Sequence, residues 1–267
     1  MKRIFPFLFF VSAIILLNSC STVPVIGRKQ LNLLPESQMV SLSLTNYKAF
    51  LDTSEVVKSG KEYDLVKSSG IKISRAVVKF LNDNQLQDRA ANFAWEYNLV
   101  KDASVNAWCM PGGKVVFYTG IMPVCADEQG VAVVMGHEIA HAVARHGNER
   151  MSQGLIAEYG SVALDLALKQ KPEQTRNIFL NAYGVGAQVG VMLPFSRKQE
   201  YEADKLGLIL MTMAGYDPNQ AVLFWEKMAK LGGTQTPEFL STHPISKKRI
   251  EALKKALPEM EAYKPKK

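Results

Sequence analysis

Apolar side chains recur every three to four positions over most of this 267-residue chain, a spacing that places them on one face of an α-helix. The first two helices are predicted over residues 35–51 and 63–82. Further helices are predicted over residues 127–146, 150–168, 197–214 and 218–230, with a last one that begins at Pro244. The chain is therefore expected to be mostly helical.

The pattern changes between the second and third helices. Residues 93–100 are rich in aromatic side chains and predict a strand, and a short second strand is expected around Ala107 and Trp108. A Pro-Gly-Gly turn signal at residues 111–113 precedes a third apolar run over 114–119. Three short strands among many helices indicate the α+β class, mostly helical.

The N-terminal segment has the features of a secretory leader. Lys2 and Arg3 precede an apolar run over residues 4–17, which is short for a spanning helix. The run closes with Leu-Asn-Ser-Cys, which resembles a bacterial lipobox and predicts that Cys20 is lipidated; a chance cysteine at the cleavage point is the alternative. Because Ser21 follows, resemblance to the enterobacterial sorting rule favours the periplasmic face of the outer membrane.

Composition indicates a globular chain with a solvated surface. Apolar residues make up 47% and charged residues 21%, and 32 basic minus 25 acidic residues give a net charge of +7. The basic excess is spread along the helices and the tail, and attraction to anionic lipid is a weaker alternative explanation. No segment resembles a nucleic-acid module. The expected organisation is a leader (1–19), a tether (20–34), one domain (35–256) and a basic tail (257–267).

Two further cysteines, Cys109 and Cys125, belong to a chain that the leader directs to a compartment permitting disulfides. A disulfide between them is predicted, joining the segment before the third helix to the entrance of that helix. Two free buried thiols are the alternative.

Residues 177–196 form a run of twenty positions without a formal charge, a length that suits a membrane span. Three amide side chains and three glycines within the run argue against a span. Small residues recur every four positions at Ala182, Gly186 and Gly190, which allows another helix to approach closely. Buried packing beside the functional site is predicted, with a membrane-contacting or mobile flap as the alternative.

The strongest chemical signal is the His-Glu-x-x-His pattern within the helix predicted over 127–146. His137 and His141 are four residues apart, which puts both imidazoles on one helix face, where they can chelate a single zinc ion. Glu138 lies beside them with a carboxylate that can activate a water molecule. His146 lies about 140° around the helix from His141 and is expected to be structural.

A catalytic zinc site needs a third protein ligand. His243 is one candidate, and Glu200 is the better one, because it stands four residues before Asp204 on one helix face while Glu202 points away. In this arrangement Glu200 binds the metal and Asp204 accepts a hydrogen bond from a ligand imidazole. An exposed acidic helix face is the alternative.

These motifs together resemble the gluzincin metallopeptidases and, within them, peptidase family M48, whose bacterial periplasmic lipoprotein branch fits best. The resemblance covers about residues 30–253, and the membrane spans of the prenyl-protease members are missing. The matching motifs are Asn106-Ala107 with residues 111–113, residues 136–141, Ser196-Arg197 with Glu200 and Ala203-Asp204, and residues 241–244 with Arg249-Ile250.

The resemblance implies a zincin-like domain with a small antiparallel sheet whose edge strand, residues 114–119, flanks the helix of the two histidines and pairs with an extended substrate. His243 is expected to stabilise the oxyanion, although a helix-start histidine is the alternative. Asn106 is either a substrate ligand or a turn former, and Arg249 orients either its loop or a substrate carboxylate. The implied substrate-binding residues are Asn106, Gly113, Lys114, Val115 and Arg249.

The function expected from this resemblance is a zinc-dependent endopeptidase, with one zinc ion per chain, that cuts misfolded or envelope proteins. Its expected partners are unfolded proteins and a membrane reached through the N-terminal lipid. One alternative is a lipid-anchored chaperone or assembly factor for outer-membrane proteins, with zinc in a structural or regulatory role. Intact Glu138 argues against this alternative, because a structural site does not need a base. A hydrolase of a non-peptide amide is the third reading.

Overall fold

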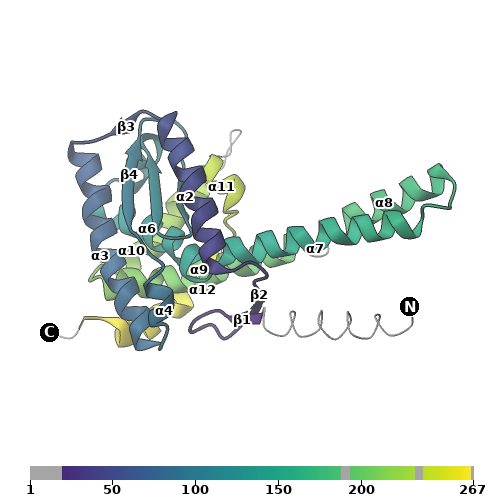
Figure 1. Cartoon of the computed structure of the whole chain (residues 1–267). Coiled ribbons are helices and arrows are strands. Elements are labelled where there is room, and N and C mark those ends of the chain that lie inside the picture. The colour runs from purple at the N-terminus through teal and green to yellow at the C-terminus, as the bar shows by residue number, and fades with distance from the viewer. Residues whose placement is uncertain (1–19, 188–192, 232–236, 266–267) are drawn as a thin grey trace. The chain divides into compact units, whose positions relative to one another are not determined.

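The computed structural model describes residues 20–187, 193–231 and 237–265, which form two compact units (Figure 1). One unit combines Met1–Glu36 with Arg145–Lys198, and the other combines Ser37–Ala144 with Gln199–Lys267. The predicted leader, residues 1–19, lies outside the described residues.

The sheet of the second unit has four strands in the order β3-β4-β6-β5. The outer pairings, β3 with β4 and β5 with β6, are antiparallel, but β4 and β6 run parallel. The sheet is therefore mixed, whereas an antiparallel one was expected, because the β5–β6 hairpin docks with its second strand against β4. The strands are β3 (Val56–Val57), β4 (Glu96–Val100), β5 (Ala107–Met110) and β6 (Lys114–Tyr118).

The predicted edge strand over 114–119 is an internal strand, and this prediction was wrong. β6 lies between β4 and β5, and β5 is the edge strand. Val115, Val116 and Phe117 are completely buried, as expected of a continuous apolar run that is covered on both faces. The edge strand does flank the helix of the two histidines, because β5 packs against α6 (Glu128–Val143).

Helix α6 runs through the core of the second unit and packs against helices from both halves of the chain. Its neighbours include α3 (Lys61–Asp83), α5 (Met122–Cys125) and α10 (Asn219–Leu231). The helices predicted over 35–51 and 63–82 are confirmed as α2 (Glu36–Asp52) and α3. The remaining elements are α4 (Gln87–Ala90), η1 (Thr119–Ile121), α9 (Leu193–Met213), α11 (Glu238–Thr242), α12 (Lys247–Ala256) and η3 (Leu257–Tyr263).

Part of the expected basic tail is folded. Residues of η3 continue from α12, and Met260 is completely buried. Apolar burial at this position holds the segment, while Lys264 forms an exposed ion pair with Glu261 at 2.6 Å.

The first unit contains a helical hairpin of α7 (His146–Ala167) and α8 (Glu173–Ala187), together with the strand pair β1 (Cys20–Thr22) and β2 (Lys29–Leu31) (Figure 1). Arg28 donates to both carboxylate oxygens of Glu149 at 2.6 and 2.8 Å. The Leu33 amide donates to Ser152 Oγ at 2.8 Å. The segment expected to be a tether is therefore fastened to the first turns of α7.

The uncharged run over 177–196 falls partly on α8 and partly outside the described residues. Buried packing was expected, but Asn177, Phe179 and Asn181 are exposed; the side chains of residues 182–196 lie outside the description. Among the helices that the structure describes, none is both long and apolar enough to cross a bilayer.

The disulfide predicted between Cys109 and Cys125 is not formed. Cys109 lies on the edge strand β5, where its thiol contacts the carbonyl of Met110, and Cys125 ends α5 in the buried contact with α6. Burial raises the pKa of the Cys125 thiol to about 12 and that of Cys109 further still. Each thiol is therefore protonated in its own element, Cys125 buried and Cys109 half-buried.

Candidate metal centre

Helix α6 presents the two histidines as their spacing predicts. The helix begins after Asp127, whose side chain accepts a hydrogen bond from the Gly130 amide at 3.0 Å. One turn separates His137 from His141, and their Nε2 atoms lie 3.2 Å apart. His137 is 2% exposed and His141 is half-buried, so the pair opens toward solvent on the His141 side.

Helix α9 approaches α6 closely enough for Glu200 to reach both histidines. A Cβ atom on Gly136 would lie 2.9 Å from the carbonyl oxygen of Gly207, so only two glycines allow this backbone contact. Glu200 Oε2 lies 3.4 Å from His137 Nε2, and Oε1 lies 3.4 Å from His141 Nε2. Glu200 therefore stands where the third ligand is predicted.

Asp204 contacts the opposite side of the His137 ring. Its Oδ1 atom lies 3.2 Å from His137 Nδ1, while Nε2 of the same ring faces Glu200. A carboxylate at Nδ1 keeps the proton on that nitrogen and leaves Nε2 with a free lone pair. Asp204 therefore occupies the predicted outer position behind the ligand.

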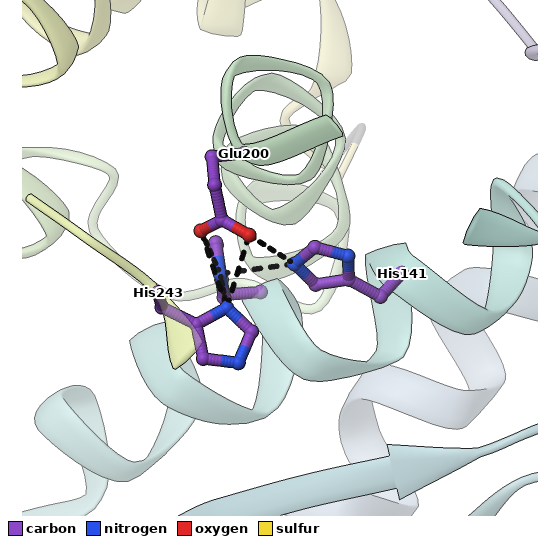
Figure 2. Close-up of side chains that lie close together, drawn as sticks. His141, Glu200 and His243 are labelled. Carbon is purple, nitrogen blue, oxygen red and sulfur yellow. Dashed lines mark hydrogen bonds and ion pairs between the residues drawn. The ribbon is translucent and has the colours of Figure 1, made fainter. Parts of the chain in front are cut away.

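His243, which follows α11, joins this group directly (Figure 2). Its Nδ1 atom lies 3.1 Å from Glu200 Oε1 and 3.3 Å from His137 Nε2. Its Nε2 atom lies 3.5 Å from Oε1 of the buried Glu138. His243 therefore links the metal-ligand candidates to the candidate base.

These four groups fit a zinc ion. One atom each from His137, His141, Glu200 and His243 lies within 4.8 Å of all the others. Four ligands held 2.0–2.1 Å from zinc at tetrahedral angles lie roughly 3.3 Å from one another. Five contacts between these side chains, which involve both carboxylate oxygens of Glu200, are 3.1 to 3.4 Å long and so are close to the edge length of such a tetrahedron.

The electrostatics of the metal-free site favour a cation. Burial raises the pKa of Glu200, but the neighbouring imidazoles outweigh burial and hold this pKa well below its usual range. Burial lowers the pKa of His137, but Asp204 and Glu200 raise it to about 9. The buried carboxylate of Glu200 is therefore held ionised, and its negative charge favours a cation between the imidazoles.

The guanidinium of Arg249 contacts carboxylates and a backbone carbonyl beside the metal-ligand candidates. It is buried and donates from Nε and Nη2 to the two oxygens of Asp204, both at 2.7 Å. Its Nη1 atom lies 3.0 Å from Glu200 Oε2 and donates to the Pro244 carbonyl at 2.9 Å. These contacts with the Pro244 carbonyl, Asp204 and Glu200 suit the loop-orienting alternative for Arg249.

The other predicted substrate-binding residues have structural contacts. Asn106 Oδ1 accepts from the amide of the next residue, Ala107, at 2.9 Å. The ammonium of Lys114, which is 6% exposed, donates to Glu96 at 2.6 Å and to the Ala94 carbonyl. Gly113 lies directly beneath the ring of Trp95, and Val115 is completely buried.

Two aromatic residues that the sequence did not single out support the site. The Trp225 ring lies 5.1 Å from His137 and 5.0 Å from the Arg249 guanidinium. The Phe239 ring stacks on His243 at 4.7 Å, and the Phe239 amide donates to the Val105 carbonyl, just before β5, at 3.0 Å. Both residues lie on apolar helix faces, so no spacing signal distinguishes them from ordinary core.

The sequence profile of Peptidase family M48 matches residues 72–257, which include all four metal-ligand candidates. The chain belongs to peptidase family M48. The M48 match extends from within α3 to the end of α12, so its C-terminal end agrees with the predicted coverage of about 30–253 and its N-terminal end lies further along the chain.

Several curated M48-like relatives are similar to the chain. Mitochondrial metalloendopeptidase OMA1 of Schizosaccharomyces pombe is 38% identical over 193 residues, which cover 70% of this chain and 52% of that protein. Its Saccharomyces cerevisiae counterpart is 39% identical, over 66% of this chain and 50% of that protein. The beta-barrel assembly-enhancing protease of Escherichia coli is 28% identical, over 58% and 33%. The chain spans about half the length of the two OMA1 relatives and about a third of the Escherichia coli protease.

Proposed function

We propose that this chain is a zinc-dependent endopeptidase, with one zinc ion held by His137, His141 and Glu200. The observation that carries the proposal is that these three side chains approach one another to 3.2 to 3.4 Å, while His243 contacts both Glu200 and the neighbouring Glu138. When bound, zinc lowers the pKa of a coordinated water to about 7 and polarises a substrate carbonyl. The metallopeptidase family supports peptide hydrolysis as the reaction.

Proton transfer, orientation of the ligand and stabilisation of the oxyanion are assigned to side chains of this chain. Glu138 takes the proton of the attacking water on its carboxylate and returns it to the leaving amine nitrogen. Asp204 keeps the proton of His137 on Nδ1, so that Nε2 stays available as a ligand atom. His243 lies within 4.8 Å of the three ligand candidates and 3.5 Å from Glu138, so it would be placed to donate to the oxyanion beside the base.

An extended substrate is best accommodated along β5. This strand pairs with β6 on one side only and packs against α6, which carries Glu138. A peptide that adds to its other edge forms backbone hydrogen bonds independent of sequence, as a protease of unfolded proteins needs. The Phe239 amide already binds the Val105 carbonyl, so α11 limits this edge at its N-terminal end.

The proposed substrates are misfolded or cell-envelope proteins, and the proposed location is the periplasmic face of the outer membrane with a lipid on Cys20. The leader and its Leu-Asn-Ser-Cys ending support this location. The name of the Escherichia coli relative, a beta-barrel assembly-enhancing protease, supports the envelope class of substrate. A chaperone is less well supported, since Glu138 is retained beside the ligands.

Replacing Glu138 with glutamine tests the proposal. The Glu138→Gln variant should keep its zinc, measured by metal analysis, and cleave unfolded casein roughly 10² to 10⁴ times more slowly. Glu158→Gln, which changes an exposed glutamate of α7, is the matched control and should cleave normally. Cleavage at the unmodified rate by Glu138→Gln, or purified protein without zinc affinity, contradicts the proposal.

A further inference from the structure

Helix α7 carries a row of exposed large apolar side chains. Ile156, Tyr159, Val162 and Leu166 are 47%, 70%, 53% and 63% exposed. Their spacings of three, three and four residues place all four within about 120° of one helix face. On α8, the partner helix of the hairpin, Phe179 is 53% exposed. We call the four α7 residues the α7 stripe.

The apolar area of the stripe helps to decide whether it contacts a second copy of the chain or a bilayer surface. Its side chains, with roughly half of their surface exposed, present on the order of 500 Å² of apolar surface. A stable protein interface needs roughly 800 Å² per partner, and its centre is normally a well-packed, concave or flat patch. A narrow row on a single helix is small for a second copy of the chain, but it is the form by which an amphipathic helix lies at a bilayer surface.

The same compact unit holds the predicted lipidation site. Cys20 begins β1, and β1 pairs with β2. Three contacts fasten the segment after Cys20 to the first turns of α7: Arg28 with Glu149, Leu33 with Ser152, and the Asn148 side chain with the Leu34 carbonyl at 2.8 Å. A lipid on Cys20 therefore anchors the unit to which α7 belongs, and α7, at 22 residues, is roughly 33 Å long.

Basic and acidic residues are balanced over residues 146–187, where Glu158 and Glu173 are exposed, and the exposed lysines gather at the turn between the two helices. Asp165 is neutralised within the hairpin, because Arg176 donates to both of its carboxylate oxygens. The turn that follows α7 exposes Lys169 and Lys171. Lysines close to anionic headgroups strengthen the binding of a peripheral helix. The charged positions of α7 also exclude a spanning orientation, in agreement with the absence of a spanning helix among the described residues.

We propose that the α7 stripe is a membrane-contact surface, which lies in the interfacial layer of a bilayer containing anionic lipid. It acts together with the lipid on Cys20, so the inference rests on the lipoprotein part of the proposed function. The lipid on Cys20 holds this unit at the bilayer, and the α7 stripe sets which side of the unit faces the bilayer.

Site-specific labelling of the full chain in vesicles tests the proposal. Tyr159→Cys and Leu166→Cys variants carry an environment-sensitive fluorophore, and Leu223→Cys on α10, where Leu223 is 57% exposed, is the matched control. The vesicles contain phosphatidylethanolamine and phosphatidylglycerol, with a quencher on the acyl chain near the headgroup. Quenching is expected at positions 159 and 166, with loss of quenching when phosphatidylglycerol is replaced by phosphatidylcholine, and none at 223.

Three results overturn the proposal. Equal quenching at 159 and 223, or none at 159 and 166, means that the stripe does not meet the bilayer. A fluorescence change at 159 that follows protein concentration without vesicles assigns the stripe to a second copy of the chain. A change on addition of casein alone assigns it to substrate. Casein cleavage in detergent reports separately on the proposed peptidase, since the labelled positions lie outside the metal centre.

Discussion

The Nδ1 atom of His137 lies 3.2 Å from Oδ1 of Asp204, and both side chains are almost completely buried. This contact decides which ring nitrogen of His137 faces the ligand set. Asp204 in turn is held by two hydrogen bonds from Arg249, so the orientation of a candidate ligand depends on α9 and α12 together.

Replacing Asp204 with asparagine should weaken zinc binding by about 10- to 100-fold, because the His137 ring loses its carboxylate partner. The measurement is competition with a chromophoric chelator. Asp83→Asn, at an exposed carboxylate of α3, is the control and should bind zinc normally. Zinc affinity unchanged by Asp204→Asn would show that the contact does not support the site.

Replacing Gly207 with alanine should separate α6 from α9. The new Cβ atom would lie 2.9 Å from the His137 amide nitrogen, so one backbone must move. We expect a loss of about 1–3 kcal/mol in the free energy of unfolding, and weaker zinc binding. The measurements are denaturant unfolding and chelator competition.

The matched control is Gly154→Ala on α7, where a Cβ atom has open space. This change should be neutral or should stabilise by roughly 0.5–1 kcal/mol, since alanine is the better helix former. If both alanine variants behave alike, close packing at Gly207 is not what brings Glu200 to the histidines.

Replacing Lys114 with methionine should reduce stability and leave the KM for an unfolded substrate unchanged. Lys114 is buried and bonded to the half-exposed Glu96, so we expect a loss of about 2 kcal/mol in the free energy of unfolding. Lys101→Met, at an exposed ion pair with Glu55, is the control and should cost less than about 1 kcal/mol. A large rise in KM instead would restore Lys114 as a substrate ligand.

The Lys114 contact also predicts a pH dependence. The hydrogen bond from Lys114 is the main cause that lowers the pKa of Glu96 from 4.5. A carboxyl group whose pKa falls on folding adds stability above its unfolded pKa, and that stability is lost as the pH drops through its folded pKa. Between pH 7 and pH 3, Lys114→Met should therefore lose less stability than the unmodified protein.

Replacing Cys20 with alanine should abolish the incorporation of labelled fatty acid when the full chain is made in a bacterium that processes lipoproteins. The thiol is the atom to which the lipobox resemblance predicts that lipid is attached. Ser21→Ala is the control and should keep the label. Label retained by Cys20→Ala would place acylation elsewhere or remove the lipoprotein assignment.

Much of the site was readable from the sequence because its chemistry is local to helices. His137 and His141, and likewise Glu200 and Asp204, are four residues apart, and the helical period alone puts each pair on one face. The apolar period also placed α2 and α3 to within about two residues. The pairing of strands is not local, so the sequence placed β6 at the sheet edge, where the structure has β5.

The sequence alone determined three things that depend on spacing along the chain. They are the main helices, the family, and the two pairs of side chains that each share a helix face, His137 with His141 and Glu200 with Asp204. That the carboxylate pair lies next to the imidazole pair was decided by the tertiary structure alone. The Gly136–Gly207 contact joins two helices that are far apart in the sequence. His243 reaches the histidines of α6 from a distant segment. Arg249 packs against Trp225 of another helix. The reduced thiols of Cys109 and Cys125 follow from the same cause, because packing of whole elements sets which side chains face each other.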